Sequence, residues 1–429
     1  MEVRDVIHGA IRLSPAETAV VDNPFVQRLR NIKQTGFSHL PFPGATHSRY
    51  SHCLGVMYLA GVAFDSVFRD WVFKDEGKRH QFREVVRMAA MCHDIGHAPY
   101  SHSTEFAMPS ISALGLTWYD DSVDIGQRAT HEDYTIAILE RTSICELIDR
   151  NFPFTSKHVA SLISTDIGGD DDFWLDGGLD YRRVLSQLIS SELDVDRLDY
   201  LVRDSYYSGA RYGMVDVPWL VSSLTAISLD GVVTLGLDRA AIYAFDDFMI
   251  ARHHMFLMVY FHHKSVIYEE LLKRFVTSPD TDFRLPGDLD EYLTVDDPWM
   301  EYHLRQSDNE WAKRFVQRDT YRRILERHGD PGQIDLSKEA ELLDDAGIDV
   351  IQSRSTGKLS RYNVFGQKRE KAASIQVIER VGGHPVEAVQ TLSQATQVFQ
   401  RYADARRIER LYVAPEDVER ARGVLGLPT

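Results

Sequence analysis

The stretch from Cys92 to His102 constrains this chain more than any other part of the sequence. It contains an adjacent His93-Asp94 pair and two further histidines. The residues from Glu84 repeat apolar side chains with a helical period, and Gly96 ends that pattern. An imidazole beside a carboxylate suits a divalent cation such as Mn, Fe, Ni or Zn, and the carboxylate can also hold Mg. Such a pair alone is more often a helix-end hydrogen bond than a metal site, so the other segments must decide.

The composition excludes several classes of protein. With 429 residues, of which 44% are hydrophobic, the chain can bury a large core and is expected to form one large domain and a smaller one. The absence of any apolar run of about 18 residues and of a signal-peptide pattern predicts a cytoplasmic protein without a membrane partner. A formal net charge of -16 argues against nucleic-acid binding without excluding it. Cys53, Cys92 and Cys145 form no CxxC pair, so no thiolate zinc site is expected.

Periodicity and turn signals predict a mainly α fold. Residues 7–13 and 224–237 have the pattern of β-hairpins, the second around Asp230-Gly231. The longer apolar-periodic segments predict helices, among them 130–150, 182–204 and 238–275. The pattern divides the chain into a helical core over 1–275, a helical extension over 276–335 and a small α+β C-terminal domain over 336–429.

Polar residues on three separate helices form a plausible metal site when taken together. A set of His52, His93, Asp94 and Asp196 supplies four ligands for one divalent ion and leaves positions for water and substrate. Basic and imidazole side chains surround this set, and they are suited to hold phosphates or to move protons near neutral pH. The phosphate-binding candidates are Arg49, Arg197 and Arg252, and the proton-transfer candidates are His97, His102 and His131. These residues together indicate phosphoester hydrolysis.

The sequence resembles the HD-domain phosphohydrolases, and within them the SAM-and-HD-domain deoxynucleoside triphosphate triphosphohydrolases and their bacterial dGTPase-like relatives. The resemblance covers roughly residues 3 to 300 in the same order, so it is more specific than the His-Asp pair alone. It implies an HD-domain helical bundle. The segments that carry it are Asp5–Gly9, Phe25–Gln34, Phe42–His52, Cys92–His102, Thr130–Glu132, Asp194–Arg197 and Tyr260–His262.

The resemblance implies a role for each matching residue. The four ligand residues would bind one metal ion, which would be Mn, Fe, Ni, Zn or Co, with Mg accompanying the substrate. His102 and His131 match catalytic histidines, one of which would protonate the 5′-oxygen leaving group as water attacks the α-phosphorus. The products would be a deoxynucleoside and inorganic triphosphate. The remaining matches are substrate contacts: Arg49, His97, Arg197 and Arg252 for the phosphates, Gln34 and Asp204 for the sugar 3′-hydroxyl, and Tyr200, Tyr260 and His262 for the rest of the nucleotide.

The resemblance also implies a regulatory site and alternatives to the first activity. Asp22, Gln27 and Arg30 match positions that read a guanine nucleotide activator in a homo-oligomer, dimer or tetramer, although they equally suit a helix cap and a solvated face. Arg197 stands where the animal enzyme has Lys, and Thr35 where it has Leu, which leaves base preference open. The alternatives are an HD-type nucleotide phosphatase or pyrophosphohydrolase, and a nucleotide-sensing or nucleic-acid-binding protein.

Overall fold

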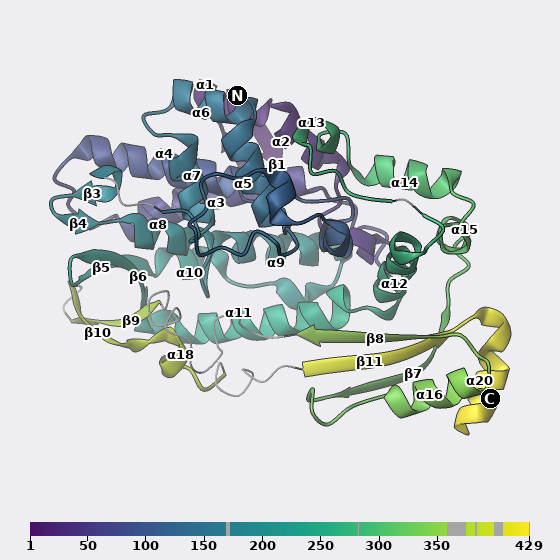
Figure 1. The fold of residues 1–429 in the computed structure, drawn as a ribbon. Helices are drawn as coiled ribbons and strands as arrows, with labels where there is room; N and C mark the ends of the chain where they lie inside the picture. The colour runs from purple at the N-terminus through teal and green to yellow at the C-terminus, as the bar shows by residue number, and fades with distance from the viewer. Residues whose placement is uncertain (169–171, 282, 358–374, 382–383, 399–405, 429) are drawn as a thin grey trace.

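The computed structural model describes residues 1–168, 172–281, 283–357, 375–381, 384–398 and 406–428. The described part is mainly α-helical with three small sheets, as the sequence predicts (Figure 1). Within it, no helix combines the length and the apolar character needed to span a membrane.

The helical core is arranged around α3 (Arg49–Val67), which has buried residues along its whole length. Helices α4 (Glu76–Cys92) and α9 (Val195–Ser208) pack against it. A helix that is buried on all sides is a core element; α4 is buried on all sides only from Val85 to Cys92, and α9 buries mainly one face. The other helices of this core are α1 Pro15–Val21, α2 Pro24–Arg28, α5 His131–Arg141, α6 Ser143–Asn151, α7 Ser156–Ile163, α8 Arg182–Ile189 and α10 Val217–Ser222.

Three helices that the sequence predicts as continuous are each broken, so these predictions were wrong. The 182–204 segment is divided into α8 and α9, because the Asp194 carboxylate accepts a hydrogen bond from the Arg197 backbone at 2.8 Å and starts a new helix. The 130–150 segment is divided into α5 and α6, where Thr142 caps α6. The 238–275 segment consists of α11 (Ile242–Met255), a π-helical turn (Phe256–Tyr260) and α12 (His263–Thr277).

The sheets lie at the edges of the helical core. The second predicted hairpin is present as β5 (Leu224–Leu229) with β6 (Val232–Asp238), whereas the first pairs β1 (Glu2–Asp5) with β2 (Gly9–Arg12) and so begins before the predicted residues 7–13. β6 belongs to a larger sheet, and its other strands are β3 Leu175–Asp176, β4 Leu179–Asp180, β9 Gln376–Val381 and β10 His384–Thr391. This sheet lies beside α11 at the lower left of Figure 1.

The third sheet has the order β7-β11-β8 and a small core of its own. Its strands are β7 (Arg322–Gly329), β11 (Arg406–Val413) and β8 (Val350–Gly357), and both neighbours of β11 are antiparallel to it. Helices α16 (Ser337–Asp345) and α20 (Val418–Leu425) pack with it. The predicted domain boundaries remain a prediction, but β7 falls within the predicted helical extension and pairs with a strand of the C-terminal region.

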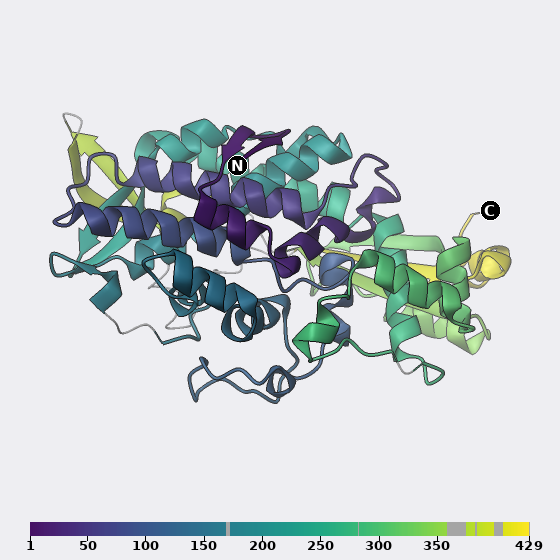
Figure 2. The same cartoon turned by 90° about the horizontal axis from the view of Figure 1, so that it is seen from above.

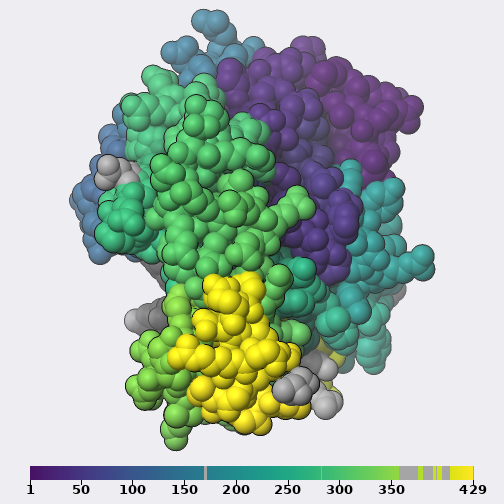
Figure 3. All heavy atoms as spheres, turned by 90° about the vertical axis from the view of Figure 1, so that its right-hand side faces the viewer, coloured from purple at the N-terminus to yellow at the C-terminus, as the bar shows by residue number. Residues whose placement is uncertain are grey.

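The segment between α12 and β7 lies against the helical core rather than apart from it. It contains α13 (Leu289–Tyr292), α14 (Asp297–Gln306) and α15 (Glu310–Gln317). Seen from the right of Figure 1, its green atoms lie between the purple N-terminal region and the yellow C-terminal helix (Figure 3). The view from above places α14 and α15 at the end of the helical core away from β5 and β6 (Figure 2).

Candidate active site

The four predicted metal ligands lie together at the ends of three helices. His52 is in the first turn of α3, His93 is the C-cap of α4 with Asp94 directly after it, and Asp196 is in the first turn of α9. Oδ1 of Asp196 lies 3.1 Å from Nε2 of His52 and 3.6 Å from Nε2 of His93. Oδ1 of Asp94 lies 3.3 Å from Nε2 of His93, and its Oδ2 lies 3.7 Å from Nε2 of His52. Ligand atoms of His52, His93 and Asp196 all lie within 4.8 Å of one another, and Asp94 lies at the edge of this group, against His93 and His52.

The side chains at this point fit a divalent cation. Nε2 of His52 and Nε2 of His93 are both buried without a hydrogen-bond partner among the described residues. Buried polar atoms are rarely left without partners, and a lone pair aimed at a cation would account for both. Histidine nitrogens and carboxylate oxygens are the ligand types that Mn, Fe, Co, Ni and Zn accept. The identity of the ion remains a prediction.

The second ring nitrogen of each histidine is fixed by a neighbour. Nδ1 of His93 donates to the carbonyl oxygen of Ala90 at 2.8 Å, and Nδ1 of His52 donates to Oδ2 of Asp199 at 2.8 Å. A proton on Nδ1 leaves the lone pair on Nε2, so these contacts hold the metal-binding tautomer. Asp199 is itself held by Arg203 and His8, at 2.7 and 2.6 Å. The sequence analysis missed Asp199, although its position one turn after Asp196 places it on the same helix face.

The charges in the cluster favour a cation. Burial lowers the pKa of His52, but the carboxylates of Asp196 and Asp199 outweigh burial and raise it to about 10, so a metal ion would bind Nε2 in place of a proton. Burial raises the pKa of Asp94, but Arg49 and the neighbouring histidines hold that pKa well below its usual range. His52 and His93 likewise lower the pKa of Asp196, so Asp94 and Asp196 are both ionised at neutral pH and stabilise positive charge at this point.

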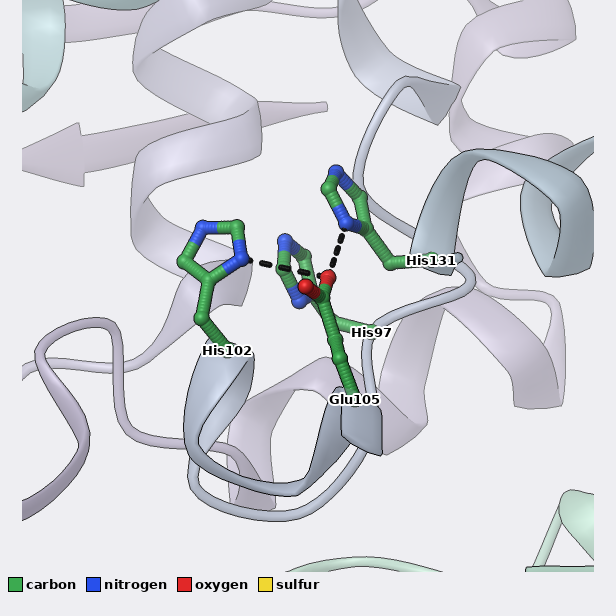
Figure 4. A group of neighbouring side chains, drawn as sticks. All are labelled: His97, His102, Glu105 and His131. Carbon is green, nitrogen blue, oxygen red and sulfur yellow. Dashed lines mark hydrogen bonds and ion pairs between the residues drawn. The ribbon is translucent and has the colours of Figure 1, made fainter. Parts of the chain in front are cut away.

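A second cluster consists of His97, His102, Glu105 and His131, in which His97 is buried, Glu105 and His131 are half-buried and His102 is exposed (Figure 4). Glu105 accepts hydrogen bonds from Nδ1 of His102 at 3.1 Å and from Nδ1 of His131. His97 stacks on His131 with ring centroids 3.9 Å apart, and its Nε2 lies 3.3 Å from Oδ1 of Asp94. Through this contact Asp94 borders both clusters. Within the second cluster the side chain of His102 is 60% exposed, whereas His97 is buried.

Glu105 is a further site residue that the sequence analysis missed. It follows His102 by three residues, and both lie in the short 3₁₀ segment η3 (Ser101–Ala107), so the spacing alone could have indicated the pair. Burial raises the pKa of Glu105, but the hydrogen bonds from His102 and His131 hold it below its usual range. The carboxylate is therefore ionised and orients both imidazoles, as a general acid or base requires.

The predicted phosphate-binding arginines come from three helices around the two clusters. Arg49 is buried, forms an ion pair with Asp94 and donates from Nε to the Ser101 hydroxyl at 2.8 Å. Arg197 contacts Asp194 at 3.3 Å, and Arg252 donates from Nε to the hydroxyl of Tyr200 at 3.2 Å. Arg49 lies beside the predicted metal ligands through its ion pair with Asp94, and a phosphate role for the three arginines remains a prediction.

The predicted sugar-binding residues lie together around Asp204. Its Oδ2 accepts a hydrogen bond from the Tyr260 hydroxyl at 2.7 Å, and its Oδ1 accepts one from Nε2 of His47 at 2.6 Å. The rings of Tyr260 and Tyr200 are 6.5 Å apart. Gln34 pairs with the backbone of His47 at 3.0 Å, and its Oε1 is buried without a partner among the described residues. Gln34 is thus linked to Asp204 through His47, and an unpaired buried amide oxygen is suited to receive a ligand hydroxyl.

The remaining predicted residues lie apart from these groups. His262 caps α12, and its ring centre lies 5.5 Å from that of Phe42. Among the described residues, no contact of His262 reaches either cluster. Gln27 accepts a hydrogen bond from Arg30, whose guanidinium lies 3.6 Å from the Tyr50 ring centre. Asp22 is exposed at the end of α1. These contacts are those of a helix end and a surface pair, and a nucleotide role for them stays a prediction.

Gly96 holds the His93–His97 loop against α5, which leads to a stability prediction. A Cβ at this position would lie 2.2 Å from the His131 carbonyl oxygen and 2.3 Å from the Thr135 amide nitrogen. We expect Gly96→Ala to lower the free energy of unfolding by about 2 kcal/mol or more, because backbone atoms cannot move aside. Urea denaturation measures this. Gly423→Ala, in helix α20 with open space around its Cβ position, is the control and should be neutral or stabilising.

Residues 49–204 match the model of the HD domain, and residues 215–341 match the model of the HD associated region. The predicted metal cluster (His52, His93, Asp94 and Asp196) and the predicted proton-transfer cluster (His97, His102, Glu105 and His131) both lie inside the stretch matched by the HD domain. They confirm the resemblance to the HD-domain phosphohydrolase superfamily that the sequence motifs indicate.

Similar proteins span a wide range of organisms. The uncharacterized protein MJ1154 of Methanocaldococcus jannaschii is 30% identical over 323 residues, which is 75% of this chain and 59% of that protein. The deoxynucleoside triphosphate triphosphohydrolase SAMHD1 of Homo sapiens is 29% identical over 215 residues, which is 48% of this chain and 33% of that protein. This chain therefore spans less than two thirds of the length of either relative. A hypothetical protein from Aquifex aeolicus has the same fold, with a TM-score of 0.74 at 23% identity over 99% of both chains.

Proposed function

We propose that this chain is a metal-dependent deoxynucleoside triphosphate triphosphohydrolase, which cleaves a dNTP to a deoxynucleoside and inorganic triphosphate. The observation that carries the proposal is the position of Asp94, whose carboxylate faces His93 of the metal cluster and His97 of the proton-transfer cluster, each at 3.3 Å. A phosphorus atom bound beside Asp94 would be within reach of both groups. Similarity to proteins named for this activity supports the substrate class.

Separate residues of the chain would bind the phosphates, bind the sugar and transfer the proton. Arg49 would hold phosphate oxygens, since its guanidinium is fixed by Asp94 and Ser101. Asp204 and Gln34 would bind the sugar 3′-hydroxyl, and the ring of Tyr260 would pack against the sugar. His102 or His131, each oriented by Glu105, would give a proton to the 5′-oxygen as the bond to phosphorus breaks.

A divalent ion bound by His52, His93, Asp94 and Asp196 would supply Lewis-acid activation of water and phosphate. Asp199 would keep His52 in the metal-binding tautomer, so metal affinity and orientation depend on the buried network behind the site.

The first test is to incubate metal-reconstituted protein with each dNTP and NTP, singly and in mixtures, and to separate the products by chromatography. We expect deoxynucleoside and intact triphosphate in equal amounts. A requirement for mixtures would support the predicted guanine nucleotide activator, and sizing with and without nucleotide would test the predicted dimer or tetramer.

Other products would point to the alternatives. Release of orthophosphate or pyrophosphate would replace the proposal with an HD-type phosphatase or pyrophosphohydrolase that uses the same metal cluster. No turnover with Mn, Fe, Co, Ni, Zn or Mg, together with tight nucleotide binding, would favour a sensor.

A further inference from the structure

A buried carboxylate from α14 joins two segments of the candidate active site that are distant in sequence. Asp297 is 1% exposed. Its Oδ2 accepts hydrogen bonds from the backbone N–H of Lys33 at 3.1 Å and from Nζ of Lys33 at 3.3 Å. Its Oδ1 accepts the backbone N–H of Tyr100 at 2.7 Å. Three donors thus converge on one carboxylate that lies outside the HD domain match.

Each of the two segments leads directly into residues of the candidate site. Lys33 precedes Gln34, and the backbone of Lys33 forms a β-bridge with Ser48, next to Arg49. Tyr100 and Ser101 precede His102, and both have left-handed backbone conformations with φ of 56° and 61°. Two consecutive non-glycine residues in this region are unfavourable and persist only where surrounding contacts hold them.

The contacts around Ser101 close a ring through these segments. The Ser101 hydroxyl accepts a hydrogen bond from Nε of Arg49 at 2.8 Å and donates one to the carbonyl oxygen of Lys33 at 2.7 Å. Lys33 and Tyr100 both bind Asp297. The Asp297 carboxylate therefore fixes the distance between the loop before His102 and the loop that carries Gln34, and Arg49 is attached to the same ring.

We propose that Asp297 is a positioning residue for the active site, which sets His102 relative to Arg49 and Gln34 and thereby gives the HD associated region a part in catalysis. The inference rests on the proposed function for its kinetic test. Tyr292 strengthens the same attachment, because its hydroxyl donates to the carbonyl oxygen of Gly96 at 2.8 Å. Asp297 touches neither metal ligand nor substrate position, so it acts only through the segments that it holds.

The decisive variant is Asp297→Asn, with Asp296→Ala as its matched control. The amide has one acceptor oxygen instead of two, and its NH₂ group would face a backbone N–H. Asp296 begins the same helix by capping Trp299 at 2.9 Å, and it contacts Asn31 at 2.8 Å. Loss of Asp296 therefore perturbs the same helix start without touching Lys33 or Tyr100. Lys33→Met removes the Nζ contacts with Asp297 and with the Tyr100 ring, 5.8 Å away, but keeps both backbone donors, and it should have an intermediate effect.

We expect Asp297→Asn to lower kcat about tenfold or more with metal content unchanged, because small displacements of reacting groups are costly. The second measurement is the rate of modification of His102 by diethyl pyrocarbonate, read by peptide mass spectrometry at several pH values. The exposed His102 ring should change its rate and its pH profile in Asp297→Asn, and should keep both in Asp296→Ala.

The measured kcat and the His102 modification profile together decide whether Asp297 is a positioning residue. An unchanged kcat and an unchanged His102 profile in Asp297→Asn would overturn it, and so would equal losses in both variants, which would mean a purely structural role. If the wild-type chain turned over no dNTP, the proposed function would fail, while the His102 profile would still decide whether Asp297 positions this segment.

Discussion

Asp196→Ala is expected to lower dNTP turnover by at least about 1,000-fold and to remove most of the bound metal. Oδ1 of Asp196 is the oxygen that both His52 and His93 approach, at 3.1 and 3.6 Å. Burial raises the pKa of Asp196, but the two histidines lower it below its usual range, so the carboxylate is charged. Its loss leaves three donors and only one carboxylate to offset a divalent cation. Metal content by mass spectrometry and turnover by chromatography measure the two effects.

The control for this variant is Asp216→Ala, which removes an aspartate of the same kind from the start of a nearby helix. Asp216 is exposed and caps Trp219 at 3.0 Å in α10. It should keep metal and turnover within about twofold, because exposed caps contribute mainly to stability. Asp196→Ala protein that keeps its metal and more than about a tenth of its turnover would contradict the four-ligand site.

Glu105→Gln is expected to lower kcat about 100-fold while the metal content stays unchanged. The carboxylate accepts hydrogen bonds from both His102 and His131. An amide can accept at its oxygen only, and its NH₂ group would face one of the two ring nitrogens. The pair would lose its common orientation and the negative charge that stabilises a protonated imidazole. Rapid-quench kinetics at several pH values should show a smaller kcat and a displaced acidic limb.

Glu132→Gln is the matched control for Glu105→Gln. Glu132 follows His131 in α5, is exposed and loses the same charge on substitution. It should leave kcat and the pH profile unchanged, since its side chain points to solvent. A kcat for Glu105→Gln within about threefold of the wild type would mean that the two histidines do not depend on this carboxylate, and proton transfer would have to be assigned elsewhere.

The two variants separate the two parts of the proposed reaction. Asp196→Ala should lose metal and turnover together, whereas Glu105→Gln should lose turnover alone. Asp94 contacts both clusters, at 3.3 Å from His93 and 3.3 Å from His97, so it is unsuitable for this separation. Asp297→Asn should resemble Glu105→Gln in keeping its metal, with a smaller loss of kcat.

Much of the candidate site can be predicted from residues that lie close together in the sequence. The adjacent His93-Asp94 pair at the end of an apolar helix and the Asp230-Gly231 turn are local signals, and the structure contains the helix end and the hairpin that they predict. Local signals also misled where a capping residue interrupts an apolar pattern. The predicted 182–204 helix is interrupted in this way: α8 ends at Ile189, and Asp194 caps the start of a new helix.

Only the tertiary structure decided which distant residues complete the site. Asp199 binds His52 across 147 residues, and Asp297 binds Tyr100 across 197 residues. Nothing in the periodicity of either segment indicates its partner, because the position of a buried carboxylate depends on how whole helices pack. The sequence by itself thus determined the types of chemical group and most of the helices that carry them. The tertiary structure decided how those groups are oriented, since orientation comes from long-range hydrogen bonds that local patterns do not encode.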